Sequence, residues 1–142
     1  MLLDAFRLIE NGHARAVPQQ HTRATFARRL TKDDGLIDWN MPAGRIHNRI
    51  RGFQPWPGSY FPMPGLSSGD MIKVQSSRVV SAAGTPGCLL EVSGEGPLVA
   101  TGEGSLRLLV LQPPGGKPMM GSDFLRGHRW LVGETLPGRN SI

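Results

Sequence analysis

The sequence reads Ile37-Asp38-Trp39 and, a few residues later, Ile46-His47-Asn48-Arg49-Ile50-Arg51-Gly52-Phe53-Gln54-Pro55-Trp56-Pro57-Gly58. The second stretch joins a short helix to a rigid corner. The helix cannot continue through Pro55 and Pro57, because a proline lacks the backbone N–H and also restricts the residue before it. The pattern therefore predicts a helix over about 41–51 and a sharp change of direction after it.

This predicted helix has an apolar face and a basic face. Ala43, Ile46 and Ile50 recur at helical spacing and are expected to point into a core. Arg45 and Arg49 are four residues apart and share a neighbouring face. One side of the helix is thus available for packing and another for binding an anion.

After the corner the sequence changes to short β-type runs separated by glycine and proline. Five candidate strands follow, at 59–62, 71–81, 87–92, 98–101 and 105–111. The turns between them, at 64–65, 84–87, 94–97 and 102–104, are short enough for hairpins. The predicted fold class is mainly β with flanking helices, arranged as a five-stranded OB-type Greek-key barrel. A small sandwich is the alternative architecture.

The ends of the chain carry weaker signals. Apolar residues at helical spacing predict a helix over 2–11 ending near Gly12, followed by a polar linker over 13–21 and a helix-compatible but unassigned segment over 22–30. Near the other end we expect a short helix over 123–126 and a frayed tail at 137–138. The predicted helix caps are Asn40, Gly52 and Ser122. A turn is predicted at 33–35, before the buried Leu36, Ile37 and Trp39.

Composition limits the function classes. A chain of 142 residues fits one domain, and its net charge of +5, with thirteen arginines among sixteen cations, favours an anionic partner. Arginine-rich composition can also follow from codon usage alone. The single cysteine, Cys88, excludes an internal disulfide, and no Cys/His pair has metal-ligand spacing. Without a signal peptide or about 20 consecutive apolar residues, the chain is predicted to be soluble and cytoplasmic.

Several residues that could carry chemistry are better explained by packing. His47 has no acid partner at a useful spacing, so we interpret it as a helix-packing histidine. Trp39 and Trp56 could stack on bases, but their apolar and proline neighbours favour the core. Cys88 lies at a strand start without a nearby histidine, which favours a buried, inert thiol. The sequence predicts no catalytic residue.

The motifs together resemble a known family. The Ile37–Trp39 and Ile46–Gly58 elements, with Pro86-Gly87, the Val99–Gly104 turn and Leu111-Gln112-Pro113-Pro114-Gly115-Gly116-Lys117-Pro118-Met119, are similar to the formyltransferase C-terminal domain, most closely that of methionyl-tRNA formyltransferases. The resemblance implies an OB-fold domain over 37–142 that lies against initiator tRNA. It also implies that residues 1–36 are a helical and linker segment leading from a separate N-terminal catalytic domain.

In that family, formyl transfer from 10-formyltetrahydrofolate uses an Asn, a His and an Asp of the catalytic domain. No position here matches them, so no catalytic residue, cofactor or metal is expected in this chain. The expected partners are initiator tRNA and the catalytic domain, with no membrane. The candidate RNA-binding residues are Arg45, Arg49, Arg51, Lys73, Arg78, Lys117, Arg126 and Arg129.

Two alternatives to RNA binding remain open at this point. The barrel could be a scaffold or dimerisation domain of a formyltransferase acting on a sugar nucleotide or on folate, whose elements look similar. It could also be a free-standing adaptor that binds protein through the apolar residues Leu2, Leu3, Phe6 and Ile9.

Overall fold

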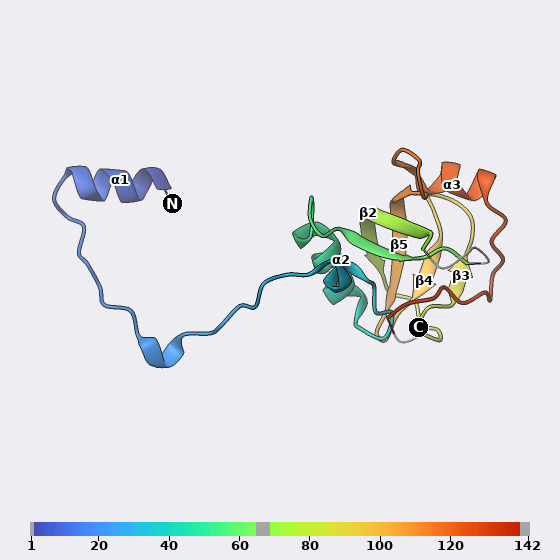
Figure 1. Cartoon of the computed structure of the whole chain (residues 1–142), viewed down its shortest axis with the longest axis horizontal. Helices are drawn as coiled ribbons and strands as arrows, with labels where there is room; N and C mark the ends of the chain where they lie inside the picture. The colour runs from blue at the N-terminus through green and yellow to red at the C-terminus, as the bar shows by residue number, and fades with distance from the viewer. Residues whose placement is uncertain (1, 65–68, 140–142) are drawn as a thin grey trace.

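A β-sheet domain and an outlying helix make up the computed structural model, which describes residues 2–64 and 69–139 (Figure 1). Helix α1 (Leu2–Glu10) confirms the first predicted helix, and Gly12 follows it with a left-handed φ of +69°. An extended segment then leads to the domain and contains two short 3-10 turns, η1 (His21–Arg23) and η2 (Lys32–Gly35). The unassigned segment 22–30 is thus not an α-helix, whereas the turn predicted at 33–35 is confirmed by η2.

Six strands form one antiparallel sheet. They are β1 (Ser59–Pro62), β2 (Met71–Val80), β3 (Leu89–Glu91), β4 (Leu98–Ala100), β5 (Ser105–Gln112) and β6 (Met119–Met120). The order is β1-β2-β5-β4-β3, with β6 paired to β5. The five predicted strands are confirmed with small shifts at their ends, and β6 is an addition. Alternating burial along β2, where Ile72 and Val74 are buried and Lys73 is exposed, shows that this strand has one face on the core.

The sheet is open in its strand pairing, so the predicted five-stranded Greek-key barrel is not confirmed. β1 and β3 are the two ends of the strand path, and no strand pairing joins them within the described residues. The predicted hairpin at 84–87 is also wrong, because β5 and β4 lie between β2 and β3. The other predicted turns join paired strands: 94–97 joins β3 to β4, and 102–104 joins β4 to β5. The loop between the paired strands β1 and β2 contains the turn predicted at 64–65, and residues 65–68 of it lie outside the described residues.

Two irregular segments cross the open side of the sheet. The Ile37 N–H donates to the Tyr60 carbonyl at 2.9 Å, and the Arg139 N–H donates to the Ile37 carbonyl at 2.9 Å. The same C-terminal segment reaches the other end of the sheet, where the Leu136 N–H donates to the Gly87 carbonyl at 2.8 Å. The predicted frayed tail at 137–138 is therefore wrong: Gly138 is buried and the Trp39 indole Nε1 donates to the Pro137 carbonyl at 3.2 Å.

The core lies between the sheet and these segments, and aromatic rings form much of it. Phe61 is fully buried, with its ring centroid 5.6 Å from that of Trp39 and 6.2 Å from that of Trp130. Phe124 stacks on His128 and contacts Trp130 at 5.0 Å. The prediction that Trp39 is a core residue is confirmed.

Two helices flank the sheet, and both begin without the predicted side-chain caps. Helix α2 (Ala43–Gly52) starts after Pro42, and the Glu103 carbonyl accepts the Ala43 N–H at 2.9 Å, so Asn40 is not its N-cap. Helix α3 (Gly121–Gly127) starts after Met120, and Ser122 is already inside it. Both helix starts are set by the strands and turns beside them rather than by a local hydroxyl or amide.

The predicted faces of α2 are confirmed. Ala43, Ile46 and Ile50 are buried against the sheet, and Gly52 is the last helical residue, with Phe53 at the C-cap. His47 packs as expected, with its Nδ1 at 3.0 Å from the hydroxyl oxygen of the buried Ser77. The helix therefore holds its arginines on a rigid support.

Candidate nucleic-acid interface

Four of the eight predicted RNA-binding residues already have partners within the protein. The Arg49 Nη2 donates to the Asp34 carbonyl at 2.5 Å, and its guanidinium lies 4.9 Å from the Phe53 ring centroid. Arg51 donates to the Asn48 side chain at 3.0 Å. Arg78 pairs with Glu95, and Arg126 pairs with Asp123. Arg49 is half-buried and holds α2 against the preceding segment, and the two ion pairs neutralise part of the charge on the surface.

The other four predicted residues are exposed and unpaired. They are Arg45 of α2, Lys73 of β2, Lys117 of the loop before β6, and Arg129, two residues after the end of α3. Their side chains form no hydrogen bond or ion pair with any other residue that the structure describes. A cation that has no carboxylate beside it keeps its full attraction for phosphate, so these four are the stronger candidates.

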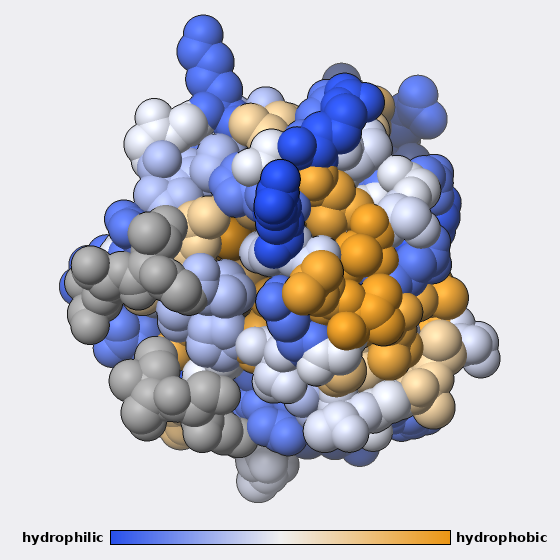
Figure 2. Space-filling model, turned by 90° about the vertical axis from the view of Figure 1, so that its right-hand side faces the viewer, coloured by the Kyte–Doolittle hydropathy of each residue, from blue (hydrophilic) through white to orange (hydrophobic). Residues whose placement is uncertain are grey.

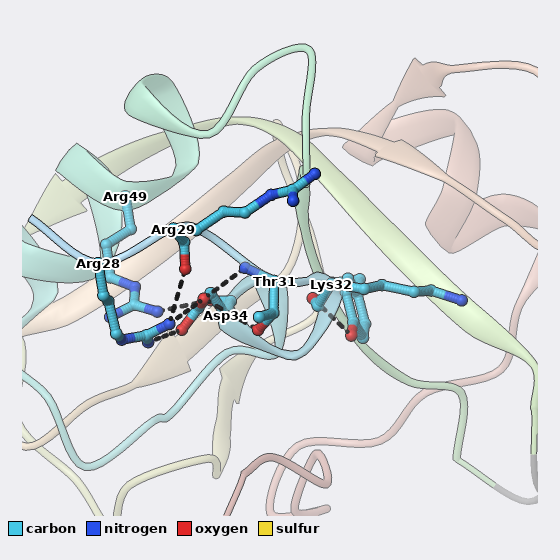
Figure 3. Close-up of polar contacts among 7 residues, drawn as sticks. Arg28, Arg29, Thr31, Lys32, Asp34 and Arg49 are labelled. Carbon is cyan, nitrogen blue, oxygen red and sulfur yellow. Dashed lines mark hydrogen bonds and ion pairs between the residues drawn. The ribbon is translucent and has the colours of Figure 1, made fainter.

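The segment before the sheet adds two cations that the sequence analysis did not select. Arg29 and Lys32 are exposed, and their side chains extend away from the polar cluster around Asp34 (Figure 3). Both lie in residues 1–36, which the sequence analysis assigns to a helical and linker segment rather than to the RNA-binding residues. No sequence signal selects them: they become candidates because η2, which begins at Lys32, is attached to the sheet by a 3.0 Å hydrogen bond from the Tyr60 hydroxyl to the Lys32 carbonyl.

Asp34 fixes this segment to α2. Asp34 is buried, with 3% of the residue exposed, and its carboxylate pairs with Arg28 and accepts the Thr31 N–H at 2.8 Å and the Thr31 hydroxyl at 3.0 Å (Figure 3). The Asp34 carbonyl accepts from Arg49, so one residue links Arg28, η2 and α2. The Arg28 guanidinium and the Thr31 N–H hold the pKa of the Asp34 carboxyl well below its ordinary value.

This lowered pKa predicts that the segment around η2, which the carboxylate ties to Arg28 and Thr31, is acid-sensitive. Because the folded-state pKa lies below the ordinary value of 3.8, the Asp34 contribution to stability is complete above about pH 5 and is lost as the pH falls below about 4. We expect Asp34→Asn to lower the thermal midpoint at pH 7. The difference between the variant and the natural chain should shrink toward zero on titration to about pH 2.

Calorimetry of both chains across this pH range checks the prediction. Asp33→Asn is the matched control, since Asp33 is exposed and next in sequence, and its carboxylate has no hydrogen-bond or ion-pair partner among the described residues. If the difference caused by Asp34→Asn does not change with pH, the carboxylate charge does not stabilise the segment around η2.

A polar groove lies at the Pro/Trp corner. Gln54, Pro55 and Pro57 line one side, and Lys73 and Gln75 of β2 line the other, around a free volume of about 230 Å³. Trp56, which lies in sequence between two of the lining prolines but does not line the groove itself, is 57% exposed, so the prediction that it is a core residue is wrong. Trp39, by contrast, is held inward: its carbonyl accepts the Gly102 N–H at 2.9 Å, and its indole Nε1 donates to the Pro137 carbonyl at 3.2 Å. No sequence signal that we used distinguishes the two tryptophans.

Residues 2–64 and 69–139 include His, Cys, Asp and Glu side chains, the types that bind metal ions. No three His, Cys, Asp or Glu side chains in these ranges gather closely enough to hold a metal ion. Cys88 is half-buried rather than buried, and its thiol points at the Leu89 carbonyl at 3.8 Å. No helix in the described part of the chain is long and apolar enough to cross a membrane.

The sequence model for the formyl transferase C-terminal domain matches residues 29–129. The chain belongs to this family. It is 37% identical over 136 residues to a methionyl-tRNA formyltransferase of Chelativorans sp. (strain BNC1), a match covering 96% of this chain and 43% of that protein. A methionyl-tRNA formyltransferase of Roseiflexus castenholzii is 40% identical over 141 residues, a match covering 97% of this chain and 44% of that protein.

This formyl transferase C-terminal domain thus spans less than half the length of the curated relatives it matches. Among solved structures, HypX from Aquifex aeolicus in complex with tetrahydrofolic acid has a TM-score of 0.57 at 16% identity, covering 97% of this chain and 26% of HypX. A multiply substituted HypX variant has a TM-score of 0.59. At this identity the HypX likeness concerns the fold alone.

Proposed function

We propose that this domain binds initiator tRNA for a methionyl-tRNA formyltransferase. In this role it positions the methionyl end of the tRNA for N-formylation in translation initiation. A separate catalytic domain would carry out that step with 10-formyltetrahydrofolate. The single observation that carries the proposal is the match of nearly the whole chain to methionyl-tRNA formyltransferases at 37–40% identity.

The surface charge gives this role a physical basis. Sequence-independent RNA binding comes mainly from cations that neutralise phosphates and release the ions condensed on them. Arg45, Lys73, Lys117 and Arg129 are exposed and unpaired among the described residues, and the whole chain carries a net charge of +5. They lie in one helix, one strand and two connecting segments, and contacts of such cations to phosphates position an RNA without reading its bases.

Helix α1 supports the second part of the proposal, the attachment to a catalytic domain. Its apolar side chains are uncovered: Leu2, Leu3 and Ile9 are 72%, 75% and 64% exposed. Phe26, farther along the extended segment, is fully exposed. Apolar side chains in such number usually mark a contact surface. We assign this surface to the catalytic part of the parent enzyme, which would cover α1 and the segment after it.

A scaffold role is the second candidate, and another apolar surface favours it. Figure 2 shows apolar side chains gathered on the face of the domain opposite α1. The segment after α3 runs along this side (Figure 1), and its Leu131 and Val132 are 64% and 63% exposed. A dimer contact on this face would suit a formyltransferase of the sugar-nucleotide or folate type, with no use for RNA.

Fluorescence anisotropy of labelled initiator tRNA with the full chain tests the proposed function. We expect a dissociation constant of about 1–100 μM near physiological salt, since sequence-independent electrostatic binding falls in this range. Affinity should rise steeply at lower salt. Sedimentation of the chain alone, measured in parallel, reports self-association. A chain that does not bind tRNA even at about 20 mM salt, but dimerises, would support the scaffold role instead.

A further inference from the structure

The groove at the Pro/Trp corner has a polar lining that the protein holds in place. The Gln54 Nε2 donates to the Gln75 carbonyl at 2.5 Å, the Gln75 Nε2 donates to the Gln112 side-chain oxygen at 3.0 Å, and the Gln112 Nε2 donates to the Gly116 carbonyl at 2.9 Å. The Gln75 and Gln112 side-chain amides thus bond to each other, and the Gln54 amide bonds to the backbone of Gln75. Each of these three side-chain amides, the amide row, is oriented by a hydrogen bond to a neighbouring residue, so it needs little ordering when a ligand arrives.

This amide row keeps donors and acceptors for a ligand. A glutamine amide has two N–H donors and one oxygen acceptor. Gln54 and Gln75 each use one N–H, and their side-chain oxygens accept no hydrogen bond from the described residues. The groove thus offers neighbouring donors and acceptors in a fixed order. A nucleobase edge presents the complementary pattern, and glutamine amides commonly pair with such edges.

A cation and a flat aromatic face complete the surroundings. Lys73 lines the groove, is directly opposite Gln112 in the strand register, and has no ion-pair partner among the described residues. Trp56 is not one of the lining residues, but it lies in sequence between two of them, Pro55 and Pro57, and is 57% exposed. An exposed indole of this kind is a stacking platform for bases, while a lysine pairs with phosphate as a point charge.

The size of the groove sets the size of its ligand. Small-molecule sites usually have volumes of about 300–1,000 Å³. The free volume here is about 230 Å³. It can admit one base or one sugar-phosphate unit but cannot enclose a cofactor. A ligand that fills the groove and continues outside it fits better than a free small molecule.

We propose that this corner groove binds one unpaired nucleotide of the RNA, with the base stacked on Trp56 and read by the Gln54 and Gln75 amides. Lys73 pairs with the adjoining phosphate. The inference rests on the proposed RNA-binding function and adds to it a preference for RNA with a single-stranded end or bulge. Exposed cations alone would not distinguish such RNA from a plain duplex, because every phosphate is alike to them.

The test uses the full chain and two RNA hairpins with the same stem, one blunt and one with a four-nucleotide 3′ overhang. We expect the overhang to be bound about tenfold more tightly, since stacking of a base on an aromatic side chain accounts for a factor of this order. In Gln54→Ala/Trp56→Ala the preference should fall to near twofold, with affinity for the blunt hairpin unchanged. Both side chains are exposed, so the variant should keep its fold, as its thermal midpoint will show.

Gln19→Ala/Gln20→Ala is the matched control, because both residues are exposed and lie in the extended segment far along the chain from the groove. It should keep the tenfold preference. Equal binding of the two hairpins by the natural chain would overturn the groove assignment and leave the proposed RNA function intact. Failure to bind either hairpin at low salt would overturn both.

Tryptophan fluorescence identifies the source of the nucleotide. Trp39 and Trp130 are buried, so quenching by a ligand at the surface reports mainly on Trp56. The overhang RNA should quench this emission, while uridine and adenosine monophosphates at millimolar concentration should not. Quenching by the free mononucleotides together with equal binding of the two hairpins would assign the groove to a soluble nucleotide and overturn the RNA assignment.

Discussion

Phe61→Ala should lower the free energy of unfolding by about 3–5 kcal/mol, the range found for a fully buried phenylalanine. The ring has no exposed surface and lies between Trp39 and Trp130, with centroid distances of 5.6 and 6.2 Å. Its loss leaves a cavity that two bulky indoles cannot readily fill. A domain of this size is stabilised by about 5–15 kcal/mol in total, so the variant is expected to be partly unfolded at 37 °C.

Urea denaturation followed by far-UV circular dichroism measures this effect. Trp56→Ala is the control, because removal of a larger aromatic ring at a 57% exposed position should cost below about 1 kcal/mol. A comparable loss in the two variants would mean that the core is not centred on β1. A loss below about 1 kcal/mol in Phe61→Ala would mean that the cavity collapses without cost and the aromatic cluster does not hold the sheet together.

The elements that sequence analysis predicted best are those whose pattern is local. Ile46 and Ile50 define the inward face of α2 by spacing alone, and the two prolines after it stop the helix for steric reasons. β1 was predicted to the residue, because Gly58 and the Pro/Gly pair after it mark both ends. In such cases the local sequence determines where the element begins and ends, and tertiary contacts do not change these bounds.

Features that depend on distant residues were not predictable in the same way. The C-terminal segment looked frayed, yet Gly138 is buried and Arg139 is hydrogen-bonded to Ile37, about a hundred residues earlier. Closure of the barrel failed for a related reason, since irregular segments rather than strand pairing cross the open side. Periodicity identifies strands, but it does not say which strands are neighbours.

The candidate site shows the same division. Two of the predicted RNA-binding arginines form ion pairs within the protein. The pair of Arg126 with Asp123 has i,i+3 spacing on a helix and is predictable from the sequence. The pair of Arg78 with Glu95 is not, because seventeen residues and a change of strand separate the two. The groove was also invisible, since its glutamines have no local pattern and come together only through the register of β2 with β5.

Replacement of Arg45, Lys73, Lys117 and Arg129 by glutamine should reduce the salt dependence of RNA binding. If each unpaired cation neutralises one phosphate, the slope of log affinity against log salt becomes less negative by about 3, at about 0.7–0.9 for each contact. The electrostatic contribution to affinity vanishes near 1 M salt. With the slope changed by about 3, the affinity of the variant at 0.1 M salt should be roughly a thousandfold lower than that of the natural chain. Anisotropy titrations at four or more salt concentrations give the slope directly.

A second fourfold variant with the same change of net charge decides whether position matters or only total charge. This control replaces four other arginines by glutamine. Arg78 and Arg126 already form ion pairs, Arg7 lies in α1, and Arg15 follows α1. We expect its slope to change by less than about 1, because paired or remote cations release few ions when RNA binds. Equal slopes in the two variants would contradict the assignment of the four unpaired cations. In that event RNA would respond to the net charge of +5 rather than to a defined surface of the domain.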